Sequence, residues 1–148
     1  MAKEQTVYKL TRPNLTTHGG YQWALGEERR ASGTGDLCGP GWLHGYTHPG
    51  LALLLNPIHA NYVPCRLFRG VGIIGQTDYG IKVGCTRLRL MAEVQVPTLT
   101  RDQRVTFALL CTLAICREPG FVSWAEGWLA GTNRSAARAA RAARAAAA

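Results

Sequence analysis

The chain has 148 residues, with 17 Lys and Arg against 9 Asp and Glu and a formal net charge of +8 at pH 7. Hydrophobic residues make up 47% and charged residues only 18%, which excludes a disordered polyelectrolyte. No apolar run approaches the roughly 18 residues of a membrane span, and the polar N-terminus lacks the apolar core of a signal peptide. We therefore expect a basic cytoplasmic protein with no membrane partner.

The first half of the chain shows short β-like runs separated by turn residues. Strands are predicted over residues 6–10, 21–25, 42–46 and 65–71. The glycine-rich stretch 27–40 predicts a loop, and residues 72–80 predict a turn region. Pro49 suits the first turn of a short buried helix over 49–55, with His48 as a candidate cap and Asn56-Pro57 as its end.

The clearest strand pattern covers residues 87–96. Apolar side chains at even positions alternate with mostly polar ones at odd positions, as in a sheet with one covered and one water-facing side. Arg87, Arg89 and Glu93 are therefore predicted to project from the same water-facing side. Arg87 and Arg89 are candidate binding residues, and Glu93 is either a catalytic carboxylate or a surface partner of one of these arginines.

Helical patterns follow the last strand. Thr100 and Gln103 form a capping box before a predicted core helix over 105–115, which Glu118-Pro119-Gly120 should end. A second capping box over 123–126 predicts a short helix closed by Gly131. Strands first and helices last favour an α+β fold: a small antiparallel sheet, one short buried helix, and two or three C-terminal helices in a compact domain over residues 1–131.

Residues 132–148 are predicted to form an alanine- and arginine-rich helical tail. Its arginines fall within an arc of roughly 120° at about 100° per residue, and they are Arg134, Arg138, Arg141 and Arg144. Such a stripe can contact phosphates or an acidic partner. Two alternatives remain open: a frayed, solvated end, or an alanine face that packs on the body or on a second copy.

The cysteines and histidines predict no metal site. Five cysteines cannot all pair within one chain and none forms a CxxC motif, which favours free thiols in a reducing compartment. Cys38, His44, His48 and Cys65 match no familiar zinc-ligand spacing. Among the four histidines, His44 in its predicted strand is the best candidate for a functional site.

Residues 37–93 resemble a group of small, uncharacterised bacteriophage and prophage proteins. The residues that carry this resemblance are Cys38, Gly41, His44, Pro49, Lys82, Val83, Gly84 and Glu93. Proteins of this group often end in alanine-rich tails. The resemblance implies a phage accessory protein in the cytoplasm of a bacterial host, where interference with a defence such as a CRISPR complex is the natural expectation.

A fainter resemblance is to the ADP-ribosyltransferase fold, carried by residues 8–12, 42–55 and 91–97 in that order. It implies NAD as the cofactor, with Glu93 stabilising an oxocarbenium-like ribosyl cation. His44 or Tyr46 would then line the nicotinamide pocket.

The first hypothesis is a non-catalytic, anti-defence binding protein without a cofactor. It would act through Arg87, Arg89 and the tail arginines on nucleic acid or a host nucleoprotein complex. The alternatives are the NAD-using enzyme, with Glu93, His44 and Tyr46 as catalytic residues, and a self-assembling homo-oligomer packed through the tail.

Overall fold

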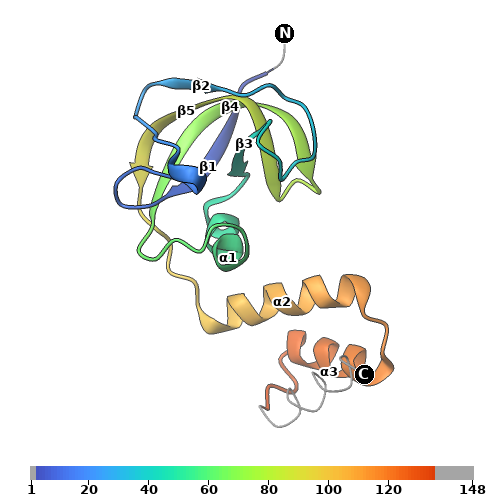
Figure 1. Ribbon diagram of the computed structural model, residues 1–148. Coiled ribbons are helices and arrows are strands. Elements are labelled where there is room, and N and C mark those ends of the chain that lie inside the picture. The colour runs from blue at the N-terminus through green and yellow to red at the C-terminus, as the bar shows by residue number, and fades with distance from the viewer. Residues whose placement is uncertain (1–2, 136–148) are drawn as a thin grey trace. The chain divides into compact units, whose positions relative to one another are not determined.

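The computed structural model describes residues 3–135 (Figure 1). The predicted α+β class is confirmed, because this part of the chain forms a five-stranded antiparallel sheet and three α-helices. The chain divides into two compact units, Met1–Leu99 with the sheet and α1, and Thr100–Ala148 with α2 and α3. The sequence predicts one compact domain over 1–131, whereas the structure groups the last two helices separately from the sheet.

The sheet of the first unit closes on itself. Its strands are β1 (Gln5–Thr11), β2 (Glu28–Arg30), β3 (Leu43–Tyr46), β4 (Arg66–Asp78) and β5 (Lys82–Val94). They follow the order β2-β5-β3-β1-β4, and β4 pairs with β5 as well as with β1. This second pairing closes β5, β3, β1 and β4 into a small barrel (Figure 1), and β2 extends the sheet from β5 outside this ring. β2 pairs with β5 beyond the part of β5 that pairs with β3.

Apolar side chains from all the long strands fill the barrel. The main buried cluster consists of Val7, Trp23, Leu43, Phe68, Val83, Cys85, Leu88 and Leu90. The predicted alternation in β5 is confirmed, since Leu88 and Leu90 are fully buried whereas Arg87 and Arg89 are partly exposed and Met91 is exposed. The period-two pattern was a reliable signal because one side of β5 faces this core.

Several predicted boundaries in the first unit are wrong. Residues 72–80 are not a turn region, because β4 continues to Asp78 and only a tight turn separates it from β5. The glycines of this stretch allow close packing instead: a Cβ at Gly72 would lie 2.9 Å from the Arg87 carbonyl oxygen. Residues 21–25 make only isolated bridges, and the predicted loop 27–40 contains β2. β5 also begins at Lys82, before the predicted start of its strand.

The side chain of Trp42 packs against the barrel and forms a hydrogen bond with the loop before β3. Its indole Nε1 donates a hydrogen bond of 3.0 Å to the carbonyl oxygen of Gly35. The ring lies against two glycines of the sheet, so that an added Cβ would be 2.6 Å from the ring at Gly75 and 3.0 Å at Gly84. The indole therefore packs directly on strand backbone, which only glycine permits at these positions.

Helix α1 (Pro49–His59) lies at one end of the barrel (Figure 1) and contacts β1 and β3. The predicted cap is confirmed, since the Nδ1 atom of His48 accepts a hydrogen bond of 3.1 Å from the amide of Gly50. The predicted end at Asn56-Pro57 is wrong. Pro57 removes one amide donor, but the turn continues because the amide of Ala60 donates to the carbonyl of Asn56 at 3.0 Å.

The second unit contains α2 (Arg101–Ile115) and α3 (Pro119–Leu129). The Thr100/Gln103 capping box is confirmed. Glu118 does not end a helix but caps α3, accepting from the amides of Gly120 and Phe121 at 2.9 and 2.5 Å, so the predicted box over 123–126 lies inside α3. The helices pack through a cluster of Leu109, Phe121, Ala125 and Trp128.

Among residues 3–135, no helix combines the length and the apolar character that a membrane crossing needs.

The close approach of β4 and β5 requires a residue without a side chain at position 70, because a Cβ at Gly70 would lie 2.5 Å from the carbonyl oxygen of Arg89. We expect Gly70→Ala to lower the free energy of unfolding by about 1–3 kcal/mol, as overpacking does elsewhere. The measurement is urea unfolding followed by circular dichroism. The control is Arg69→Ala at the exposed neighbouring position, where a change below about 0.5 kcal/mol is expected. Equal midpoints for the two variants would contradict the close approach.

Candidate anion-binding sites

Arginines gather on the outer side of β2 and β5. Arg30 lies directly opposite Arg87, and Glu28 lies directly opposite Arg89. Residues paired in this way across antiparallel strands have side chains on the same side of the sheet. Arg30, Arg87 and Arg89 therefore share one surface with the carboxylate of Glu28, and we call these three arginines the arginine face.

Glu28 is shared between two members of the arginine face. Its carboxylate accepts a hydrogen bond of 2.8 Å from Arg30 Nε and lies 3.7 Å from Arg87 Nη1. The Nε atom of Arg89 is buried and has no hydrogen-bond partner among residues 3–135. Like charges placed directly opposite each other repel, and the carboxylate of Glu28 reduces this repulsion between Arg30 and Arg87. The surface keeps an excess of positive charge.

Glu93 has a different partner from the one predicted. Its carboxylate accepts hydrogen bonds of 2.8 and 2.6 Å from Nε and Nη2 of Arg66. These bonds lower the pKa of Glu93 and raise that of Arg66, although both side chains lie at the surface. The predicted pairing with Arg87 or Arg89 is wrong, because Arg66 begins β4 beside the end of β5, whereas Arg89 lies roughly 13 Å back along the strand.

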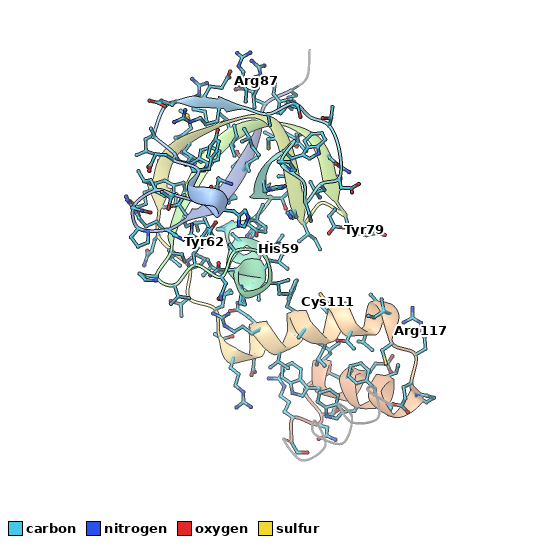
Figure 2. The ribbon with its side chains drawn as sticks, viewed as in Figure 1. His59, Tyr62, Tyr79, Arg87, Cys111 and Arg117 are labelled. Carbon is cyan, nitrogen blue, oxygen red and sulfur yellow. The ribbon has the colours of Figure 1, made fainter. Side chains whose placement is uncertain are left out.

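His44 and Tyr46 line a cavity of about 100 Å³, which we call the lysine cavity. Strands β1, β3 and β5, the end of α1 and the loop with the short 3₁₀ helix His18–Gly20 contribute to it. Its lining residues are Lys9, Leu10, Thr17, His18, His44, Tyr46, His59, Ala60, Tyr62 and Lys82. Figure 2 shows His59 and Tyr62 beside α1, at the opposite end of the first unit from Arg87.

Two lysines of the lysine cavity are nearly buried, each with 8% of its surface exposed. Lys9 Nζ donates a hydrogen bond of 2.6 Å to the carbonyl oxygen of His44 and lies 4.7 Å from the centre of a Trp23 ring. Lys82 Nζ lies 3.2 Å from Cys38 Sγ. Among residues 3–135, no Asp or Glu lines this cavity. Buried lysines are rare unless a carboxylate pairs with them, which makes this arrangement unusual.

Burial and nearby charges shift the pKa values of several groups that line the lysine cavity. Burial lowers the pKa of Lys9 to about 8, and the charge of Lys82 lowers it further while that of Cys85 opposes the change. Burial is also the main cause that lowers the pKa of His44 and His59, and Lys82 adds to it, while the hydrogen bond to Leu37 opposes the change at His44 and Asp78 opposes it at His59. Burial raises the pKa of Tyr46 to about 12. All these shifts disfavour added charge in a site without an anion.

Hydrogen bonds hold the two aromatic groups of the lysine cavity in place. His44 Nε2 bonds to the carbonyl oxygen of Leu37, which requires the proton on Nε2. The Tyr46 hydroxyl lies 3.2 Å from His59 Nδ1, and the two rings are nearly parallel at 12°. The side chains of His44 and Tyr46 are thus committed to positions beside the two lysines.

The structure does not bring Glu93 to His44 and Tyr46. His44 pairs with Gly84, and Glu93 lies nine residues further along β5, roughly 30 Å of extended chain. The carboxylate is exposed and held by Arg66, outside the lysine cavity. The three catalytic residues implied by the ADP-ribosyltransferase resemblance therefore do not form one site.

The remaining candidates are placed as follows. Cys38, His44, His48 and Cys65 do not converge, and no cluster of three or more possible metal ligands occurs in the part of the chain that the structure describes. Arg134 forms an ion pair with Asp102 and lies 4.5 Å from the centre of a Trp128 ring. Arg138, Arg141 and Arg144 lie outside the described residues.

The sequence interpretation assigned neither lysine of the cavity to a functional site. A signal for Lys9 was present, since Val7, Lys9 and Thr11 alternate in β1 and all three are buried. A lysine in the covered register of a strand is a marker of an unusual site. No comparable local signal marked Lys82, which reaches the cavity through the pairing of β5 with β3.

Comparison with known proteins gave no relative: no family model, curated protein or solved structure matches the chain.

The lowered pKa of Lys9 predicts a specific dependence of stability on pH. Between its folded value of about 8 and the ordinary value of 10.5, the unfolded chain binds more protons than the folded one, so stability gains from rising pH. Relative to Lys9→Met, the wild-type free energy of unfolding should rise across this range by up to about 3 kcal/mol. The measurement is urea unfolding at several pH values.

The exposed Lys3 provides a matched control for this comparison. Lys3→Met should follow the wild-type pH profile. A wild-type profile parallel to that of Lys9→Met would show that Lys9 keeps its ordinary pKa in the folded protein.

Proposed function

We propose that the protein is a non-catalytic binding protein for nucleic acid or a nucleoprotein complex, and that the arginine face makes the contact. The observation that carries the proposal is the placement of Arg30, Arg87 and Arg89 on one side of the sheet with Glu28 as their shared carboxylate. The resemblance to phage accessory proteins supports a host defence complex as the source of the nucleic acid.

The arginine face suits recognition of the phosphate backbone. A guanidinium group presents a planar set of donors that fits phosphate oxygens, and its charge persists across the physiological pH range. Arg87 and Arg89, two residues apart on one side of β5, are about 7 Å apart along the strand. The cross-strand set of Glu28, Arg30, Arg87 and Arg89 contains no aromatic side chain for base stacking. Binding should therefore depend strongly on salt and weakly on sequence.

The charge of Arg89 adds to this argument. Its buried Nε atom is closed to a ligand, so a phosphate would contact the terminal guanidinium nitrogens. Glu28 already contacts Arg30 and Arg87, and Arg89 forms no ion pair among the residues that the structure describes. Among the three residues of the arginine face, Arg89 is therefore the one whose charge a bound phosphate would balance most.

The NAD-using alternative receives no such support, because Glu93 is separated from His44 and Tyr46 and is bound by Arg66. No observation on the described residues favours self-assembly over binding. The arginine face is the feature on which the proposed function rests.

The double variant Arg87→Ala/Arg89→Ala should weaken binding to duplex DNA or RNA by at least about tenfold at low salt. The slope of log affinity against log salt concentration should fall by about two, because two phosphate contacts are lost. Fluorescence anisotropy over a salt series measures both quantities. The control Lys3→Ala/Arg69→Ala removes the same charge from exposed positions of the same unit and should change both much less. Equal losses in the two variants would indicate unspecific attraction and overturn the assigned surface.

The tail is tested separately. Replacing Arg138, Arg141 and Arg144 with alanine should reduce affinity and flatten the salt dependence if the tail contributes phosphate contacts. Arg134→Ala is the comparison, since this arginine is already paired with Asp102 and should matter less. An unchanged affinity and slope in the triple variant would confine binding to the arginine face.

A further inference from the structure

The lysine cavity combines two buried ammonium groups with no carboxylate in its lining. Moving an ammonium group out of water without a compensating anion is costly, so a folded protein normally pairs it, excludes it from the interior or uses it. None of the ion pairs in the described part of the chain involves Lys9 or Lys82. Asp78 lies directly opposite Lys82 across β4 and β5, but it neither lines the cavity nor forms an ion pair with either lysine, so a bound anion would balance positive charge there.

The hydrogen bonds of the two ammonium groups leave donors available. An ammonium group has three N–H donors. Lys9 donates one to the His44 carbonyl and otherwise faces the Trp23 ring, and Lys82 has only the Cys38 sulfur, which is a weak acceptor. A ligand that supplies several strong acceptor oxygens would use these donors.

The remaining lining groups favour an oxygen-rich anion as well. The imidazole of His59 and the hydroxyl of Tyr46 lie beside each other, and His18 also lines the cavity. His18 and one member of the hydrogen-bonded Tyr46–His59 pair can each donate a hydrogen bond to an anion. The absence of Asp and Glu from this lining makes a metal cation a poor fit, because hard cations require oxygen ligands.

Volume and charge together select the class of anion. A cavity of about 100 Å³ has room for a few water molecules or one compact group, but not for a nucleobase and its sugar together. Two ammonium groups are balanced by a dianion, whereas a carboxylate balances only one. A phosphate with two negative charges meets both requirements.

We propose that the lysine cavity binds a phosphate dianion, either free or as the terminal group of a phosphate monoester, through Lys9 and Lys82. This site is distinct from the arginine face, which lies at the other end of the first unit (Figure 2). The arginine face would contact internal phosphates of a strand, which carry one charge each, whereas the cavity would take an end group or a free ion.

The first experiment titrates the wild-type chain with inorganic phosphate while the ring signals of His44 and His59 are followed by NMR. Both signals should shift with saturation, and the melting temperature should rise with the phosphate concentration, as it does for any ligand bound by the folded state alone. Ring signals and a melting temperature that do not respond to phosphate would overturn the proposal. This outcome requires no variant and leaves the test of the arginine face unaffected.

The second experiment compares Lys9→Met and Lys82→Met with Lys3→Met as the matched control. Methionine keeps much of the length of the side chain and removes the charge. Each cavity variant should bind phosphate at least about tenfold more weakly, because a charged hydrogen bond is lost, while Lys3→Met should bind as the wild type does. Equal affinity in all three variants would overturn the assignment, since phosphate would then bind elsewhere.

The third experiment separates the two sources of the phosphate. A short oligonucleotide with a 5′-phosphate is compared with the same oligonucleotide ending in a 5′-hydroxyl, using the ring signals of His44 and His59. Shifts with the phosphorylated form alone support a terminal phosphate as the ligand. Shifts with inorganic phosphate but with neither oligonucleotide support a free ion. Shifts with both oligonucleotides would contradict a site that selects dianions.

Discussion

The pairing of β5 on both edges holds the first unit together. One edge runs beside β4 for its whole length, and the other is shared between β3 and β2. The register of β5 with these strands, including its irregularities against β4, decides where each of its side chains lies. Lys82 at its start therefore lines the lysine cavity, Arg87 and Arg89 in its middle lie on the arginine face, and Glu93 near its end lies beside Arg66.

The parts of the fold that could be predicted were those with a local cause. The alternation of β5 and the Thr100/Gln103 capping box each depend on residues a few positions apart. The predicted element boundaries were wrong at residues that are compatible with more than one local structure. Glycines at 72 and 75 indicate a turn in isolation, but here they admit a carbonyl and an indole ring against the strand. Pro57 indicates a helix end, yet α1 tolerates it two residues before its end.

The candidate sites also differ in whether they depend on residues of one strand or on the pairing of several strands. Arg87 and Arg89 could be placed together because one strand carries both. The lysine cavity could not be predicted, because β1 and β5 meet there only through β3 and the closure of the barrel. The partner of Glu93 was likewise decided by the register of β4 on β5, which places Arg66 at the end of the strand.

Trp42 has a consequence for which substitutions the chain can accept. Its ring occupies the space that side chains at Gly75 and Gly84 would need, so these three positions share one volume. A smaller residue at 42 would leave a void, and a larger one at 75 or 84 would collide with the indole. Either change alone is unfavourable, whereas a matched pair can restore the packing. Amino-acid choice at these sites is therefore epistatic, with a coupling energy that only combined variants reveal.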